Sequence, residues 1–297
     1  MFLMDTLTKA LFFLFLAGSM LGIGLKTGKD ELLSVVRDKG WLVRAFVANF
    51  LLIPAVGVLA ARTLPMRPEN AAALIILACA AGGMSALQFL SKKKGAAALA
   101  YGGGTTALLS FFSILISPAL MALTLPKGAP LIIPYGKAVL FVSLFMLLPL
   151  VLGALVHGTA GAVAGKLAGP VSWAATLAFV GTTVKLSTLT KWAKEGVGAK
   201  GLLAIAVFIL VSMVIGWTLG GPRKFTRPVL ATSSSMRNIA LCLAVAARSF
   251  SDLSVLTPLV AFVSLMVPAN LLLSVVSLAA GKFAERRASG PGPAAMG

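Results

Sequence analysis

The sequence predicts an all-α protein that crosses a membrane many times. Apolar residues make up 59% of its 297 residues and charged residues only 11%, whereas an ordinary soluble domain carries about 25% charged residues. The mean hydropathy is +0.99. A chain with so few polar groups cannot cover a water-exposed surface, which excludes a soluble enzyme and a nucleic-acid-binding domain. The net charge of +18 lies mostly in connections between apolar runs, so we assign it to the membrane surface.

Apolar runs long enough to cross a bilayer recur along nearly the whole chain. A spanning helix needs about 20 mostly apolar residues, because each residue advances a helix by about 1.5 Å. About nine runs qualify, and none of the connections is long enough for a separate soluble domain. In order, the predicted transmembrane helices are 8–26, 41–61, 70–91, 96–124, 131–157, 169–190, 200–220, 228–249 and 254–281.

The basic residues predict which side of the membrane each connection faces. Most lysines and arginines lie in connections that share one side with the C-terminus, and the positive-inside rule assigns that side to the cytoplasm. We therefore expect the N-terminus outside and the C-terminus in the cytoplasm. The run 8–26 could instead be a signal peptide, but its apolar residues continue past the small residues 17–19, which favours a retained helix.

Two predicted helices contain residues that interrupt helices. Glycine pairs and serine clusters do so in membranes where the freed backbone lines a cavity, and paired interruptions in two halves of a chain indicate a transporter binding site. The same residues also occur where helices pack closely. We favour broken helices in an inverted repeat, because the two segments occupy similar places in halves of opposite orientation. The expected breaks are Gly82, Gly83, Ser234, Ser235 and Met236.

Arg237 is the most unusual residue of the second interruption. An arginine at the centre of a membrane helix costs about 2.5–3.5 kcal/mol on insertion scales, and apolar or small residues on both sides hinder its reach to an interface. All eight acidic residues lie in the termini or connections. We expect the guanidinium to meet backbone carbonyls, water or an anionic ligand. The neighbouring Asn238 and the more distant Asn270 either face a ligand or bond another helix.

Residues for catalysis are scarce. His157 is the only histidine, and the two cysteines, Cys79 and Cys242, lie in apolar runs without metal-ligand spacing. An enzyme in the membrane would need carboxylates, histidines or metal ligands inside its spans. We expect no enzyme, no metal site and no organic cofactor.

At these residues the sequence resembles the bile acid:sodium symporter family, from about Leu7 to Ala280. The family's first broken helix carries a Cys-Pro-Gly-Gly-type stretch followed by Ser-Asn, which corresponds to residues 79–87 here. The second carries a Glu followed by Gly-Met-Gln-Asn, which corresponds to residues 233–238, and the stretches 22–26 and 48–54 also look like family signatures. The resemblance is to divergent bacterial-type members, which implies the inner (cytoplasmic) membrane of a bacterium.

The resemblance implies a panel domain and a core domain, with the two broken helices crossing in the core. The panel would hold the first, fifth and sixth spans, and the core the others. The implied segments are 1–61 (panel helix one and core helix two), 62–130 (core helices with the first broken helix), 131–199 (panel helices), 200–282 (core helices with the second broken helix) and 283–297 (a disordered cytoplasmic tail). The resemblance places substrate contacts at Met84, Asn238 and Ala269, and the predicted substrate-binding set also includes Ser85, Arg237 and Asn270.

The residues at the positions of the family's sodium ligands differ from the residues that the family has there. The resemblance places these ligands at Asn49, Ala86, Leu87, Ala100, Gly104, Ser233 and Arg237. The family carboxylate is missing, and a fixed cation is added. A unit charge about 4 Å from sodium repels it by about 4 kcal/mol at an effective dielectric constant near 20, which weakens binding roughly a thousandfold.

The resemblance therefore implies a secondary transporter of small organic anions, either bile-acid-like or other carboxylates, with its sodium coupling lost or altered. Arg237 would either stand in for sodium or bind the substrate carboxylate. Two alternatives stay open. One is a sodium-coupled symporter with rebuilt cation sites, and the other is a channel or sensor of the same fold that has lost transport. The expected partners are the anion and the lipid bilayer, without nucleic acid.

Overall fold

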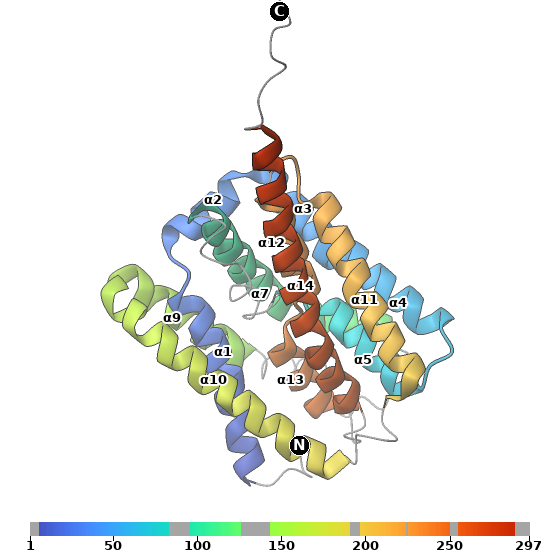
Figure 1. Ribbon diagram of the computed structural model, residues 1–297. Coiled ribbons are helices and arrows are strands. Elements are labelled where there is room, and N and C mark those ends of the chain that lie inside the picture. Colours follow the sequence, from blue (N-terminus) through green and yellow to red (C-terminus); the bar gives the residue numbers. More distant parts are fainter. Residues whose placement is uncertain are drawn as a thin grey trace, which may run out of the picture.

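Helices account for almost all of the chain that the structure describes. The structure is a computed structural model, and it describes residues 6–82, 96–125, 143–190, 197–223, 225–249 and 255–288. Within these ranges there is no strand, which confirms the all-α class. The first helix, α1, begins at one end of the molecule, and the last helix, α14, ends at the opposite end (Figure 1).

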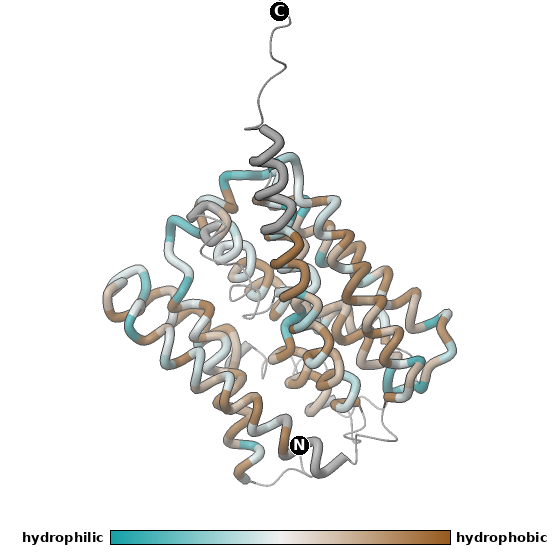
Figure 2. Tube along the Cα trace, in the orientation of Figure 1, coloured by the Kyte–Doolittle hydropathy of each residue, from teal (hydrophilic) through white to brown (hydrophobic). Residues whose placement is uncertain are grey.

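Several of these helices could cross a membrane. Seven helices in the described ranges are long and apolar enough, and two further apolar helices, Pro68–Cys79 and Phe145–Thr159, are shorter. The count of nine spans stays a prediction, because parts of the third and fifth predicted spans lie outside the described residues. Hydrophilic residues lie mainly towards the two ends of the molecule (Figure 2). The seven helices are Thr6–Leu25, Lys39–Thr63, Tyr101–Thr124, Gly161–Thr182, Gly198–Leu219, Thr226–Ala247 and Leu256–Ser277.

Three helices pack together along one side of the molecule (Figure 1). Helix α1 (Thr6–Leu25) lies along α9 (Leu148–Thr159) and α10 (Gly161–Thr190). Glycines allow this approach, because a Cβ atom at Gly24 would run into the backbone of α9, and one at Gly153 into the backbone of α1. These helices belong to the spans that we assigned to the panel. The division into panel and core, and the inverted repeat, remain predictions.

The remaining helices pack against one another and enclose one apolar segment completely. The apolar window of 226–247 is 100% buried, whereas the windows of the other six candidate spans are 28–56% buried. Protein therefore surrounds this segment along its length. The helices of this group are α2 (Lys29–Arg37), α3 (Lys39–Phe46), α4 (Ile53–Thr63), α5 (Pro68–Cys79), α7 (Ala96–Thr124), α11 (Gly198–Leu219), α12 (Thr226–Ser235), α13 (Ile239–Ser249) and α14 (Leu256–Ala288).

Two wide helical turns precede prolines. The π-helical segments η1 (Val47–Leu52) and η3 (Ser143–Leu147) lead into α4 and α9, which carry Pro54 and Pro149 at their second positions. Proline has no N–H group, and its ring collides with the carbonyl group four residues earlier. A wider turn before the proline accommodates both effects. In η1 this turn contains Asn49, which is fully buried.

The structure differs from the predicted spans in three places. Helix α2 was not predicted, because a helix of nine residues is too short to cross a membrane. The feature of the sequence that could have indicated it is an apolar residue, the buried Val35, in a segment with charged ends. Helix α10 begins at Gly161 rather than residue 169. Helix α14 continues to Ala288, into the tail expected to be disordered from residue 283, because Ala, Glu and Arg there favour a helix.

Candidate functional site

The end of α5 meets the connection between α12 and α13. Helix α5 ends at Cys79, α12 ends at Ser235, and α13 begins at Ile239. The backbone N–H of Asn238 donates to the carbonyl oxygen of Ala80 at 3.1 Å, which ties the two segments together. We call residues 77–82 together with 233–239 the junction.

Local chemistry explains why the helices stop here. The Asn238 side chain accepts a hydrogen bond from the N–H of Leu241 at 3.1 Å, and so caps the start of α13. The Ser235 hydroxyl lies 3.2 Å from the carbonyl oxygen of Thr232, within the last turn of α12, and shares its one proton between this oxygen and Asn270 Oδ1. Beyond α5, Gly82 has φ +74°, a conformation that glycine adopts without strain.

The Arg237 guanidinium is buried in the junction. Its Nε–H donates to Leu77 O at 2.8 Å, and Nη2 donates to Ala78 O at 2.6 Å. Nη1 donates to Asn49 Oδ1 at 2.9 Å and to Ser234 O at 3.2 Å. Arg237 is 1% exposed. Four hydrogen bonds thus engage a group that has five N–H donors.

Three of the four acceptors are backbone carbonyls in the last turns of two helices, and of these Leu77 O also accepts from the N–H of Ala80 at 3.3 Å. The last four carbonyls of an α-helix have no intrahelical donor and carry the negative end of the helix dipole. Leu77 and Ala78 lie in the last turn of α5, and Ser234 lies in the last turn of α12. Arg237 therefore joins two helix ends of the same polarity by placing a positive charge between them. In membrane transporters such helix ends also coordinate sodium.

The predicted amide side chains of Asn49 and Asn270 form hydrogen bonds with neighbouring residues around the junction. Besides accepting from Arg237, Asn49 donates from Nδ2 to Ala45 O at 3.0 Å and to Ser234 Oγ at 3.1 Å. Ser235 Oγ donates to Asn270 Oδ1 at 2.9 Å. The structure thus brings two hydrogen-bonded groups together on η1, α12, α14 and the connection after α12: Asn49 with Ser234 and Arg237, and Ser235 with Asn270.

Two predicted polar groups keep unused hydrogen-bonding capacity. Ser233 Oγ and Asn238 Nδ2 are buried without a hydrogen-bond partner among the described residues. Ala269, another predicted substrate contact, is half-buried on α14. The predicted positions Gly83, Met84, Ser85, Ala86 and Leu87 lie outside the described residues, as does the side chain of Ala100 in α7.

Gly104 has a packing role that the sequence did not reveal. A Cβ atom at Gly104 would run into the backbone oxygen of Glu31 in α2, and would lie 2.8 Å from Val35 Cγ2. Helix α2 therefore occupies the space that a side chain at this family ligand position would need. The glycine is required by the contact between α2 and α7.

A row of hydroxyl groups on α7, not predicted from the sequence, reaches the end of α5. Thr106, Ser110, Ser113 and Ser117 are all buried, at a spacing that places them on one helix face. Ser117 Oγ donates to the carbonyl of Cys79 at 2.6 Å and lies 2.7 Å from Ser113 Oγ. The spacing of four, three and four residues was the signal in the sequence.

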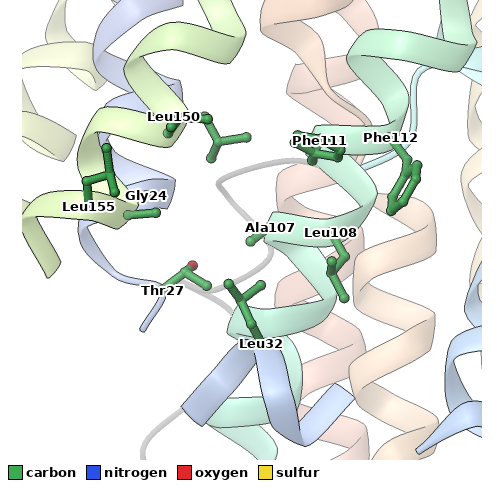
Figure 3. Close-up of a pocket in the computed structure, with 11 residues that line it drawn as sticks. Gly24, Thr27, Leu32, Ala107, Leu108, Phe111, Phe112, Leu150 and Leu155 are labelled. Carbon is green, nitrogen blue, oxygen red and sulfur yellow. The ribbon is translucent and has the colours of Figure 1, made fainter. Parts of the chain in front are cut away.

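A separate apolar cavity of about 410 Å³ lies where α1, α2, α7 and α9 meet (Figure 3). Among the described residues of its lining, Thr27 supplies the only polar side chain. No predicted substrate residue with a described side chain lines this cavity. The lining residues are Gly24, Thr27, Leu32, Ala107, Leu108, Phe111, Phe112, Leu150, Val151, Ala154 and Leu155.

A polar cluster connects the corner between α2 and α3 to α7 and to the α11–α12 connection. Arg223 Nη1 lies 3.0 Å from Asp38 Oδ2 and donates to the Tyr101 hydroxyl at 2.8 Å. Asp38 Oδ1 also accepts from the Trp41 N–H at 3.0 Å, and so caps α3. The hydrogen bond to Tyr101, and then the negative charge of Asp38, raise the pKa of Arg223.

Comparison with known proteins identifies a family. The family model described as Sodium Bile acid symporter family matches residues 12–192, which run from α1 to the end of α10 and stop before Arg237. A search of curated proteins finds no match. Members of the family are transporters rather than enzymes, and the apolar helices agree with an integral membrane protein. Because the match covers more than half of the chain, this protein belongs to the sodium bile acid symporter family.

Proposed function

We propose that this protein is a secondary transporter of small organic anions that works by alternating access in a bacterial inner membrane, and that its sodium coupling is lost. Family membership supports transport. The loss of sodium coupling rests on one observation, the guanidinium of Arg237 among the carbonyl oxygens of the junction.

The guanidinium supplies the positive charge and the contacts to carbonyl oxygens that a sodium ion would supply at the junction. It offsets the negative ends of α5 and α12, and it meets carbonyl oxygens of their last turns at 2.6–3.2 Å. A sodium ion on the same oxygens would lie within about 4 Å of this charge, and the repulsion of about 4 kcal/mol corresponds to roughly a thousandfold weaker binding. The predicted spans also contain no carboxylate to offset a second cation. The residues at the junction are therefore unsuitable as a binding site for sodium.

Burial favours this role for Arg237 over direct contact with the substrate. The side chain is 1% exposed, and protein acceptors take four of its five N–H groups. Asn238 is the better candidate for a substrate contact, because its Nδ2 group has no protein partner and it caps the positive end of α13. Ser233 Oγ is a second candidate for the same reason.

The apolar cavity fits the body of an amphipathic anion. Its walls come from α1 and α9, which belong to the proposed panel, and from α7, which belongs to the proposed core. A movement between these helices would open or close it, as alternating access requires. The lining would hold an apolar group, so the carboxylate would have to reach polar groups elsewhere.

Counterflow in liposomes tests the function directly. The purified protein is reconstituted, the vesicles are loaded with an unlabelled bile acid or keto acid, and entry of the labelled compound is measured in sodium and in potassium. We expect saturable counterflow at the same rate in both ions. Faster counterflow in sodium would restore the symporter alternative, and non-saturating flux with single-channel currents would identify a channel.

A further inference from the structure

A groove of about 350 Å³ lies between the end of α1 and the surface of α10. It is lined by Lys26, Gly169, Ser172, Trp173 and Thr176, and we call it the Lys26 groove. The four α10 residues are spaced by three, one and three positions, so they occupy one face of that helix. None of these residues contributes to the junction or to the apolar cavity.

The groove opens away from the protein interior. Trp173 is 69% exposed, and a Cβ atom added at Gly169 would meet nothing within 4 Å. Further along the same helix, Leu177 and Val180 are 65% and 51% exposed. Exposed apolar side chains on a membrane helix face lipid, so the groove opens towards the bilayer.

The amine of Lys26 is a charge without a counter-charge. No carboxylate lies within ion-pair distance of it among the residues that the structure describes. The side chain is half-buried, and burial lowers the pKa of Lys26. The hydroxyls of Ser172 and Thr176 donate to backbone carbonyls of α10. The donors left for a ligand in the groove are therefore the Lys26 ammonium and the indole N–H of Trp173.

Lys26 marks where the apolar stretch of α1 ends, which is the level at which we expect the lipid headgroups. Lys26 is the first residue after the apolar helix Thr6–Leu25, and Lys29 and Arg37 follow on α2. By the positive-inside rule this end of α1 faces the cytoplasm, where the leaflet is rich in anionic lipids. Lysine and tryptophan are typical of this interfacial level, and basic pockets between membrane helices on this side bind anionic headgroups.

We propose that the Lys26 groove binds the phosphodiester headgroup of an anionic phospholipid, with the Lys26 ammonium as counter-charge and Trp173 at the rim. The acyl chains would lie along the exposed apolar face of α10. A soluble phosphate ester offers the same headgroup chemistry, but the opening towards the bilayer favours a lipid. The lipid would bridge α1 and α10, and its binding does not depend on the transported substrate.

Lipid binding by the intact, detergent-purified protein tests this site. Phosphatidylglycerol and phosphatidylcholine with identical acyl chains are titrated, and bound lipid is counted by native mass spectrometry. We expect a preference for phosphatidylglycerol that Lys26→Gln lowers about fivefold, the effect of one lysine near an anionic surface. Lys26→Arg should keep the preference. Lys166→Gln is the matched control, because Lys166 is an exposed lysine on α10.

The outcomes separate the site from general charge attraction. An unchanged preference in Lys26→Gln, or an equal loss in Lys166→Gln, would overturn the proposal. Competition by millimolar glycerol phosphate would show that a soluble anion, not a lipid, is the ligand. If Lys26→Gln does not fold, Trp173→Leu replaces an exposed ring and should lower the preference about twofold or more. Because the readout is lipid binding, an absence of anion transport would leave this result intact.

Discussion

Removing the guanidinium of Arg237 should weaken the fold and create a response to sodium. In Arg237→Ala, three buried acceptors at the junction lose their donor: the carbonyls of Ala78 and Ser234, and the side-chain oxygen of Asn49, whereas the carbonyl of Leu77 keeps the N–H of Ala80. Each unsatisfied buried acceptor costs about 1 kcal/mol or more. The sum over three acceptors, about 3 kcal/mol, lies at the lower end of the 3–5 kcal/mol typical of breaking a buried charged network.

The same substitution removes the charge that repels cations. About 4 kcal/mol of repulsion disappears, while the carbonyl oxygens of the two helix ends remain. Sodium should then bind the variant and stabilise it, by about 2.7 kcal/mol at a concentration a hundred times its Kd. The double variant Arg237→Gln with Ser233→Glu restores an amide and a carboxylate at family ligand positions, and should show the largest sodium effect.

Thermal unfolding in sodium and in potassium at matched ionic strength measures both effects. The unchanged protein should unfold at the same temperature in the two salts. Arg237→Ala should unfold earlier in potassium and recover partly in sodium. Arg227→Ala is the matched control, because Arg227 lies on the same helix, α12, but is exposed. If Arg237→Ala behaves like this control, and neither Arg237 variant responds to sodium, the guanidinium does not hold the junction together.

Three further substitutions test the cavity, the α2 contact and the α3 cap. Ala107→Phe fills the apolar cavity and should lower counterflow at least tenfold at unchanged thermal stability, whereas Ala174→Phe on the exposed face of α10 should not. Gly104→Thr should destabilise by about 1–3 kcal/mol through overpacking against α2, whereas Gly158→Ala, with nothing within 4 Å, should change stability by less than about 1 kcal/mol. In denaturant unfolding, Asp38→Ala should cost about 1 kcal/mol more than Asp38→Asn, because only asparagine keeps the cap of α3.

Each of these three predictions has an outcome that would contradict it. Normal counterflow in Ala107→Phe would mean that the substrate does not pass the cavity. A Gly104→Thr protein as stable as the unchanged one would mean that α2 moves aside without cost. Equal stability of the two Asp38 variants would assign the effect to the exposed ion pair, which contributes about 1 kcal/mol at most.

The helices could be predicted because a bilayer imposes a length on them. Helix α7, Ala96–Thr124, coincides with the predicted run, and the need of Arg237 for a partner followed from the cost of an isolated charge in a membrane. The partners themselves could not be predicted, because every residue has a carbonyl group and only the fold shows which helix ends meet. The role of Gly104 could not be predicted either, because it depends on the packing of α2, and α2 is too short to be recognised as a membrane span.

A cation that is part of the chain cannot leave with the substrate. In a symporter the bound sodium is released on each cycle, so its gradient drives the anion inwards. Arg237 is covalently attached and stays at the junction. On the proposed mechanism, the charge moved per cycle is then that of the anion alone. A membrane potential of 100 mV, negative inside, would favour outward movement of a monovalent anion by about 2.3 kcal/mol, so at equal concentrations on the two sides this carrier would export the anion unless a second anion returned in exchange.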